Sequence, residues 1–122
     1  MSNLQNVIAV VDDDPEICAS LEALLSAYRY DVETFNSAEA FLARASTCRA
    51  LCLIVDIHLG DITGVELAHQ LAADGFKFPI IFMTGRRDAS IERQAFAVGG
   101  VAFLHKPFPA AMLIDAIKKA AG

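Results

Sequence analysis

The sequence predicts a doubly wound α/β domain, in which a parallel sheet of five strands carries helices on both faces. Two observations predict this class. Short apolar runs alternate five times with amphipathic segments of helical length, which is the pattern of parallel strands joined by right-handed helical crossovers. The length of 122 residues also fits one domain, residues 1–122, because domains cluster at about 100–150 residues.

The predicted strands are the five apolar runs. Most of them lack polar alternation and are rich in Val, Ile, Leu and Phe, as expected of parallel strands that are covered on both faces. In chain order they are residues 7–11, 32–35, 51–55, 79–83 and 101–104. We expect these strands to be buried.

The predicted helices follow the strands, because apolar residues recur there at helical spacing. Those residues are Ile17, Leu21, Leu24 and Leu25; Ala38, Phe41 and Leu42; Val65, Leu67, Ala68 and Leu71; Ile91, Ala95 and Val98; and Leu113, Ile117 and Ala120. Asp14 followed by Pro15 predicts an N-cap for the first helix, and Ser37 and Thr63 are suitable caps for the second and third.

Composition excludes several functional classes. A net charge of −5 argues against direct binding of nucleic acid by this domain, because the phosphates of nucleic acid attract basic surfaces. No apolar stretch approaches the ~18 residues of a membrane span, and no signal peptide is visible, so we expect no contact with a membrane. Three cysteines, Cys18, Cys48 and Cys52, suit reduced thiols better than a disulfide framework. We therefore expect a cytoplasmic protein.

Polar residues follow the predicted strands at their carboxyl ends, which is where open α/β sheets bind their ligands. The residues concerned are Asp12, Asp13 and Asp14 after the first run, Asp56 after the third, Thr84 after the fourth and Lys106 after the fifth. Asp14 is explained as a helix cap. We expect the other carboxylates, the hydroxyl and the ammonium to converge on one edge of the sheet.

Such a set suits phosphoryl chemistry. Asp12 and Asp13 would repel Asp56 unless a cation lay between them, and hard oxygen ligands with room for water favour Mg²⁺. An aspartate can act as a nucleophile that forms an acyl phosphate, which an ammonium and a hydroxyl can stabilise. Each residue alone has a simpler explanation as a turn cap or a surface charge. Their ordered placement favours the phosphoryl site.

Four segments carry a resemblance to a known family: VVDDDP at 10–15, LIVDIHLGDITGVEL at 53–67, IIFMTG at 80–85 and FLHKPF at 103–108. Together they resemble the receiver domain of bacterial two-component response regulators over essentially the whole chain. The resemblance implies a flavodoxin-like (βα)5 fold with strand order 2-1-3-4-5. It also implies that Asp56 accepts a phosphoryl group from a sensor histidine kinase. DITGVEL and IIFMTG favour the FixJ-like branch, whose members carry a helix-turn-helix output domain after the receiver.

The resemblance also assigns the metal ligands. Asp13 and Asp56 would bind Mg²⁺ (or Mn²⁺) directly, Asp12 would act through metal-bound water, and the backbone carbonyl of His58 would complete the protein ligands. Lys106 would pair with a phosphoryl oxygen, and its peptide bond to Pro107 is expected to be cis.

The same resemblance implies a conformational switch and residues that set the lifetime of the acyl phosphate. The Thr84 hydroxyl would move toward the phosphoryl group and the Phe103 ring would turn inward, although Phe103 is equally explained as a core residue. The changed surface would comprise the fourth helix, fifth strand and fifth helix, where an output domain, an output protein or a second copy binds upon phosphorylation. We hypothesise that the bulky His58 and Arg86 side chains tune the lifetime of the acyl phosphate by altering water access.

One departure from the family lies in the loop after Asp56. Leu59-Gly60 stands where receivers usually carry Met-Pro. The loop therefore loses the φ restraint of proline, and we expect it to be more mobile.

Two alternatives remain open at this stage. The first is an Mg²⁺-dependent phosphohydrolase with an aspartyl nucleophile, but this sequence lacks the second aspartate that such an enzyme carries two residues after the nucleophile, here Asp56. The second is a degenerate receiver that only binds partners, which would not need the intact polar set. We expect no enzymatic turnover beyond self-phosphorylation and self-dephosphorylation. Zinc, dinucleotide and NTP sites lack their motifs. As part of a longer protein the domain would belong to a transcription factor; alone it would be a single-domain regulator or phosphate shuttle.

Overall fold

Five parallel strands form one sheet in the order β2-β1-β3-β4-β5 in the computed structural model, which describes residues 6–86 and 88–121. The elements in chain order are β1 (Val7–Val11), α1 (Pro15–Ala27), β2 (Asp31–Phe35), α2 (Ala38–Leu42), β3 (Cys52–Asp56), α3 (Gly64–Ala73), β4 (Ile80–Thr84), α4 (Ala89–Ala97), β5 (Gly100–His105) and α5 (Ala110–Ala121). The predicted alternation and strand order are confirmed.

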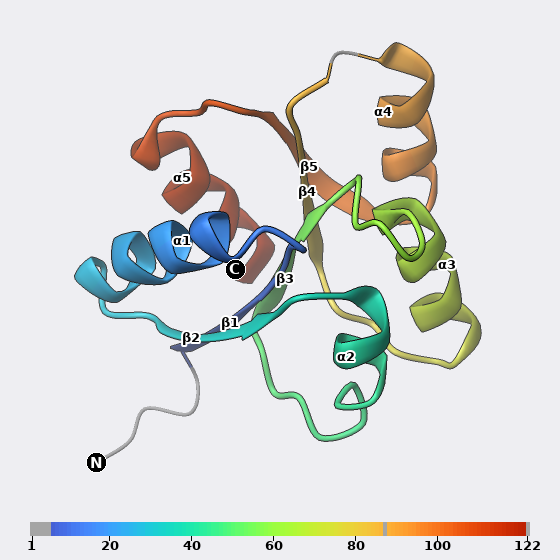
Figure 1. Cartoon of the computed structure of the whole chain (residues 1–122), viewed down its shortest axis with the longest axis horizontal. Helices are drawn as coiled ribbons and strands as arrows, with labels where there is room; N and C mark the ends of the chain where they lie inside the picture. The colour runs from blue at the N-terminus through green and yellow to red at the C-terminus, as the bar shows by residue number, and fades with distance from the viewer. Residues whose placement is uncertain (1–5, 87, 122) are drawn as a thin grey trace.

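Helices cover both faces of the sheet, α1 and α5 on one side and α2, α3 and α4 on the other (Figure 1). The pleat of each strand sends alternate side chains to the two faces. In β3, Leu53 and Val55 join the core cluster under α2, α3 and α4, whereas Cys52 and Ile54 join the cluster under α1 and α5. The burial predicted for all five strands is confirmed for β1, β3 and β4. It is wrong for the edge strands β2 and β5, which are only partly buried because the helices cover the edges of the sheet less completely than its middle.

The strands that end at the candidate site run one residue further than the apolar pattern predicts. β3, β4 and β5 end at Asp56, Thr84 and His105, because parallel pairing continues through Asp56 with Met83 and through Thr84 with His105. Side-chain polarity marks the end of an apolar run, whereas the ladder depends on backbone groups. Asp56 and Thr84 consequently stand on the sheet itself rather than in loops.

Capping residues begin the first three helices as predicted. The Asp14 carboxylate accepts a hydrogen bond from the backbone N–H of Glu16 at 2.9 Å, and the Ser37 hydroxyl accepts one from Ala40 at 3.0 Å. Thr63 begins α3 with a reciprocal capping box. The second helix is short, with five residues, and turns follow it.

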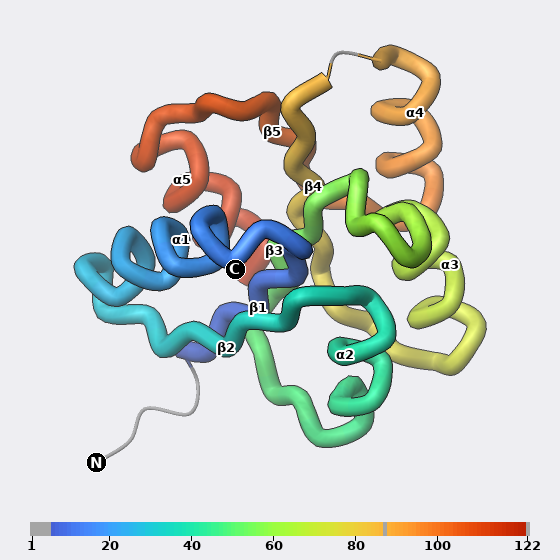
Figure 2. The backbone as a smooth tube through the Cα atoms, in the orientation of Figure 1, coloured from blue at the N-terminus to red at the C-terminus, as the bar shows by residue number. Residues whose placement is uncertain are grey.

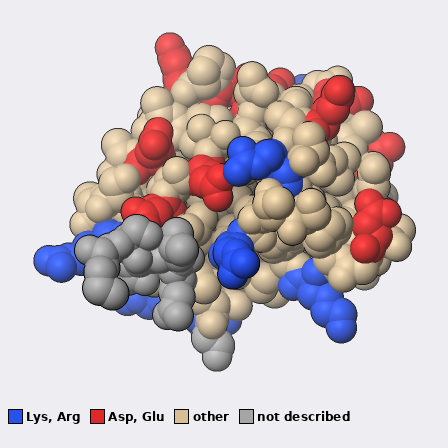
Figure 3. Space-filling view, turned by 90° about the horizontal axis from the view of Figure 1, so that it is seen from below, with Lys and Arg blue, Asp and Glu red and all other residues tan. Residues whose placement is uncertain are grey.

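Charge is mixed on the face seen from below. Lys and Arg side chains lie there as separate groups between acidic side chains and uncharged surface (Figure 3). Among the described residues of this face there is no continuous basic stripe of the kind that binds nucleic-acid phosphates. Within residues 6–86 and 88–121, no helix combines the length and apolar character that a bilayer crossing needs.

Candidate functional site

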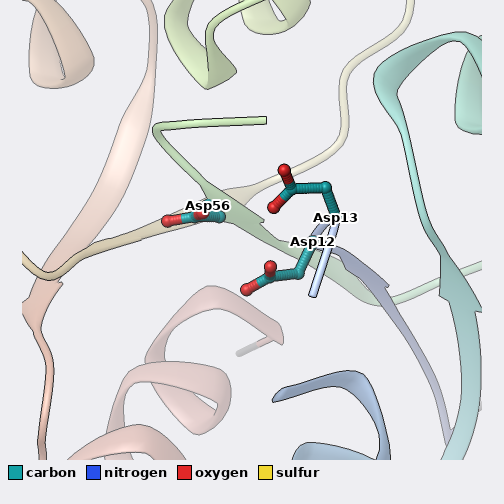
Figure 4. A group of neighbouring side chains, drawn as sticks. All are labelled: Asp12, Asp13 and Asp56. Carbon is teal, nitrogen blue, oxygen red and sulfur yellow. The ribbon is translucent and has the colours of Figure 1, made fainter. Parts of the chain in front are cut away.

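Three carboxylates meet where β1 and β3 end, and the backbone trace shows these two strand ends side by side (Figure 2). One carboxylate oxygen each from Asp12, Asp13 and Asp56 lies within 4.8 Å of the other two. All three carboxylates point to the same side (Figure 4). Asp12 and Asp56 are buried, with 1% and 6% of their surface exposed, while Asp13 is exposed. The predicted convergence of these side chains is present.

The sheet and its hydrogen bonds orient the two buried carboxylates. Asp56 continues the series of β3 side chains that face α1 and α5. The backbone N–H of Asp12 donates to the Phe35 carbonyl at 3.0 Å, and its carboxylate accepts from the backbone N–H of Asp14 at 2.9 Å. The Cys18 thiol donates to the Asp12 carbonyl at 3.3 Å, a contact that the sequence pattern does not indicate.

Lys106 brings a positive charge to this cluster. Its Nζ lies 3.4 Å from Asp12 Oδ2 and 3.4 Å from Asp56 Oδ1. The backbone N–H of Lys106 donates to the Thr84 carbonyl at 2.7 Å, which ties the loop after β5 to the end of β4. The Lys106–Pro107 peptide is cis, as the resemblance implied.

Burial makes the negative charge costly here. Desolvation raises the pKa of Asp56, the Lys106 charge partly opposes this rise, and the Asp12 charge adds to it. Desolvation likewise raises the pKa of Asp12 against the backbone hydrogen bond from Asp14 and the charge of Lys106. Three clustered hard oxygen donors, two of them poorly solvated, suit a divalent cation such as Mg²⁺. The acidic cluster therefore fits a metal ion.

Thr84 lies at the end of β4, and Phe103 lies within the neighbouring strand β5. Thr84 is 2% exposed, and its hydroxyl oxygen accepts the backbone N–H of Arg86 at 3.1 Å. Phe103 is half-buried against the cluster under α2, α3 and α4, with its ring centroid 6.4 Å from Phe96 and 5.3 Å from His105. The structure thus places Phe103 at the border between the core and the surface.

The two predicted lifetime-tuning residues differ in their surroundings. Arg86 is exposed. His58 is half-exposed, yet its Nε2 atom is buried and has no hydrogen-bond partner among the described residues. The imidazole lines a cavity of about 150 Å³ between the loop after β3 and α4. The other lining residues are Ile57, Thr63, Val65, Ile91 and Gln94.

The loop that departs from the family turns at Gly60. Gly60 has a φ of 92°, which L side chains rarely adopt and which proline cannot. A Cβ at this position would lie 3.3 Å from Asp13 Oδ2. The next residue, Asp61, accepts a hydrogen bond from the backbone N–H of Glu39 at 3.2 Å. The hydrogen bond to Glu39 was not predicted, because loop composition does not show which distant element a loop touches.

Cysteine and histidine contribute no metal centre in the part of the chain that the structure describes, since the one group of three or more potential ligands there is the aspartate cluster. The three cysteines are unpaired. Burial raises the pKa of the Cys52 thiol to about 12, which keeps it protonated and unreactive.

Comparison with known proteins identifies the family. A family model for the response regulator receiver domain matches residues 8–118. The transcriptional regulatory protein TdiR of Thauera aromatica is 36% identical over 115 residues, which cover 94% of this chain and 51% of TdiR. The transcriptional regulatory protein FixJ of Rhizobium meliloti is 35% identical over 113 residues, which cover 93% of this chain and 55% of FixJ. The chain thus spans about half the length of these relatives.

Solved structures agree with this result. The crystal structure of FixJ-N has a TM-score of 0.90 at 34% identity, and the match covers 99% of this chain and 95% of that one. Full-length FixJ from B. japonicum has a TM-score of 0.89 at 34% identity, with 95% of this chain and 57% of that one covered. The chain therefore belongs to the response regulator receiver domain family, the signalling domains of two-component systems.

Proposed function

We propose that residues 1–122 form one receiver domain that accepts a phosphoryl group on Asp56 from the phosphohistidine of a sensor histidine kinase. The observation that carries this proposal is the surroundings of the Asp56 carboxylate. It is buried at a strand end, one of its oxygens lies 3.4 Å from the Lys106 ammonium, and Asp12 and Asp13 complete an acidic cluster beside it.

The proposed metal is Mg²⁺, or Mn²⁺ in its place. Asp13, Asp56 and the backbone carbonyl of His58 would hold it directly, and Asp12 would hold one of its waters. When bound, the metal neutralises charge on the phosphoryl oxygens. Support comes from the three clustered oxygen donors. The raised pKa values of Asp12 and Asp56 indicate that their ionised forms are unfavourable, and a bound cation would stabilise those forms.

The proposed step is a phosphoryl transfer. A carboxylate oxygen of Asp56 bonds to phosphorus while the P–N bond of the phosphohistidine breaks, and the electron pair of that bond stays on the imidazole nitrogen. The Lys106 ammonium stabilises a phosphoryl oxygen electrostatically. The Thr84 hydroxyl oxygen already accepts the N–H of Arg86, so its O–H is available to donate to another phosphoryl oxygen.

The proposed output is a change in the surface of α4, β5 and α5. Movement of Thr84 toward the phosphoryl group would free space for the Phe103 ring, which lies between Phe96 and His105. Phosphorylation would then bias a two-state equilibrium of this surface. Large apolar side chains are already exposed on it, namely Phe96, Val101 and Met112 at 47%, 49% and 49%. An output domain, an output protein or a second copy would bind there.

We further propose that His58 and Arg86 set the lifetime of the acyl phosphate, and that the domain turns over no external substrate. The whole protein would regulate transcription through a separate output domain, as the names of TdiR and FixJ indicate for those proteins. This receiver would not bind nucleic acid itself. A cytoplasmic location is part of the proposal, because unpaired cysteines suit a reducing compartment.

The deciding experiment is intact-mass analysis after incubation with acetyl phosphate and Mg²⁺. A gain of one phosphoryl group, about 80 Da, that disappears in Asp56→Asn and in the presence of EDTA supports the proposal. A gain that survives Asp56→Asn identifies a different nucleophile. No gain in any sample, together with no binding of Mg²⁺, indicates a degenerate receiver that only binds partners.

A further inference from the structure

The loop between β3 and α3 is closed at its base and attached at its tip. At the base, an isolated antiparallel bridge joins His58 to Thr63, and the backbone N–H of Gly64 donates to the Ile57 carbonyl at 2.8 Å. The tip consists of Gly60 and Asp61. These contacts fix the base of the loop but not its tip. The direction of the tip therefore depends on what holds Asp61.

Asp61 connects the tip to a distant segment. Its Oδ2 accepts the backbone N–H of Glu39 in the first turn of α2, 22 residues away in sequence. In Figure 2 the loop before α3 runs close to the start of α2. Although slight desolvation acts in the opposite direction, hydrogen bonds from backbone N–H groups, including those of Ile62 and Glu39, lower the pKa of Asp61. The hydrogen bond from Glu39 therefore attaches the Asp61 carboxylate to α2.

The other residue of the tip lies against the acidic cluster. A Cβ at Gly60 would lie 3.3 Å from Asp13 Oδ2, so a side chain at this position would crowd that carboxylate. Asp13 is the exposed member of the cluster, so fewer protein contacts restrain it than restrain Asp12 or Asp56. The tip of the loop therefore lies beside the Asp13 carboxylate.

From these contacts we infer that Asp61 is a positioning residue for the metal site: by anchoring the loop tip on α2 it holds Gly60 against Asp13 and keeps that carboxylate in place for a divalent cation. Asp61 itself does not bind the metal. The inference rests on the proposed function, because it concerns the affinity of the same aspartate cluster for Mg²⁺.

Direct Mg²⁺ titration followed by ¹H–¹⁵N NMR tests this inference without any phosphorylation. Residues that hold metal ligands in place typically alter metal affinity 10- to 100-fold, and the exposure of Asp61 favours the lower end. We expect Asp61→Ala to weaken Mg²⁺ binding about tenfold and to shift the Glu39 amide resonance. Gly60→Ala should weaken binding as well, through the crowding of Asp13.

Two matched variants separate anchoring from other effects. Asp61→Asn removes the same negative charge as Asp61→Ala but keeps an oxygen that can accept the Glu39 N–H, so we expect its affinity to lie near that of the wild type. Ser37→Ala removes the other side-chain cap of α2, the acceptor for Ala40, without touching the loop. We expect it to bind Mg²⁺ as the wild type does.

Three outcomes would overturn the inference. If Asp61→Ala and Asp61→Asn weaken Mg²⁺ binding equally, the effect is due to charge, and if Ser37→Ala weakens it as much, the effect is due to fraying of α2. An Mg²⁺ affinity that is unchanged in Asp61→Ala also overturns the inference. If Mg²⁺ changes neither the spectrum of the wild-type protein nor that of Asp13→Asn, the protein does not bind the metal. That result overturns the proposed function together with the inference.

Discussion

The Lys106 ammonium lies 3.4 Å from Asp56 Oδ1, although the two residues are 50 positions apart in the sequence. The same nitrogen lies 3.4 Å from Asp12 Oδ2. Both carboxylates are buried, and the side chain of Lys106 is 26% exposed. Lys106 is thus the cation that compensates the acidic cluster in the metal-free protein.

Removal of this cation should destabilise the domain. Lys106→Ala leaves Asp12 and Asp56 facing each other without the ammonium, and loss of a partner for a buried charge costs about 1–3 kcal/mol when solvent partly screens it. We expect the free energy of unfolding in urea at pH 7 without Mg²⁺ to fall by that amount. Lys119→Ala, an exposed change in α5, is the control and should have little effect. Equal stability of Lys106→Ala and the wild type would contradict the compensation described above.

Neutralising Asp56 should have the opposite effect. Since desolvation raises its pKa despite Lys106, the ionised carboxylate is less favourable in the folded protein than in the unfolded chain. Asp56→Asn should therefore raise the free energy of unfolding, and with it the Tm, of the metal-free protein at pH 7. Differential scanning calorimetry with EDTA measures the change.

The pH dependence of that difference follows from the direction of the shift. Between the ordinary pKa of 3.8 and the raised folded value, the folded protein binds more protons than the unfolded chain, so its stability falls as the pH rises. The advantage of Asp56→Asn should be absent below pH 3.8, grow through this interval and stay constant above it. An advantage that grows as the pH falls would show that the folded pKa is lowered instead.

Close packing at Gly100 gives a steric prediction. A Cβ there would lie 2.7 Å from the Ala95 carbonyl oxygen and 2.9 Å from two ring atoms of Phe82. Because backbone and a buried ring cannot easily move, Gly100→Ala should reduce the free energy of unfolding by about 1–3 kcal/mol. Gly85→Ala is the matched control, since no atom lies within 4 Å of its Cβ position. Equal stabilities of the two variants would contradict the close approach of α4 to β5 at this point.

Apolar periodicity was sufficient to predict the alternation of five strands and five helices, whereas the strand order came from the family resemblance. The acidic cluster was predictable for a related reason. Asp12, Asp13 and Asp56 interrupt or follow apolar runs, and parallel strands bring their carboxyl ends to one edge.

The remaining features depend on contacts that no local pattern records. The hydrogen bond from Glu39 to Asp61 joins the first turn of α2 to a loop 22 residues away, and neither segment has a local pattern that indicates the other. The left-handed φ of 92° at Gly60, and the short distance that a Cβ there would have to Asp13 Oδ2, are not visible in the composition of the loop. The cavity that His58 lines is closed in part by Ile91 and Gln94 of α4, a helix distant from His58 in the sequence.

The proposed output surface can be tested at Val101, which is 49% exposed on β5. If phosphorylated copies pair through α4, β5 and α5, a buried glutamate at this position would lack a partner. Val101→Glu should accept the phosphoryl group at the wild-type rate but remain monomeric in analytical ultracentrifugation. Tyr28→Glu, at an equally exposed position after α1, should dimerise normally. Monomeric wild-type protein after complete phosphorylation would remove the homodimer from the proposal and leave a separate output partner.

The lifetime of the acyl phosphate should depend on His58. His58 lines the cavity of about 150 Å³ between the loop after β3 and α4, and its charge acts on Asp56. His58→Ala should join that cavity to the site, admit water and accelerate dephosphorylation about threefold to tenfold, or by about 0.7–1.4 kcal/mol of activation free energy. Arg86→Ala should act in the same direction, more weakly, because Arg86 is exposed.

Decay of the intact-mass phosphoryl signal after removal of acetyl phosphate measures this rate. His69→Ala is the matched control, since His69 is an exposed histidine on α3 away from the cavity. The orphaned Nε2 adds a second test: His58→Phe keeps the bulk of the ring without the polar atom. If bulk excludes water, His58→Phe should retain the slow wild-type decay. Unchanged decay in the His58→Ala, Arg86→Ala double variant would show that neither side chain controls water access to Asp56.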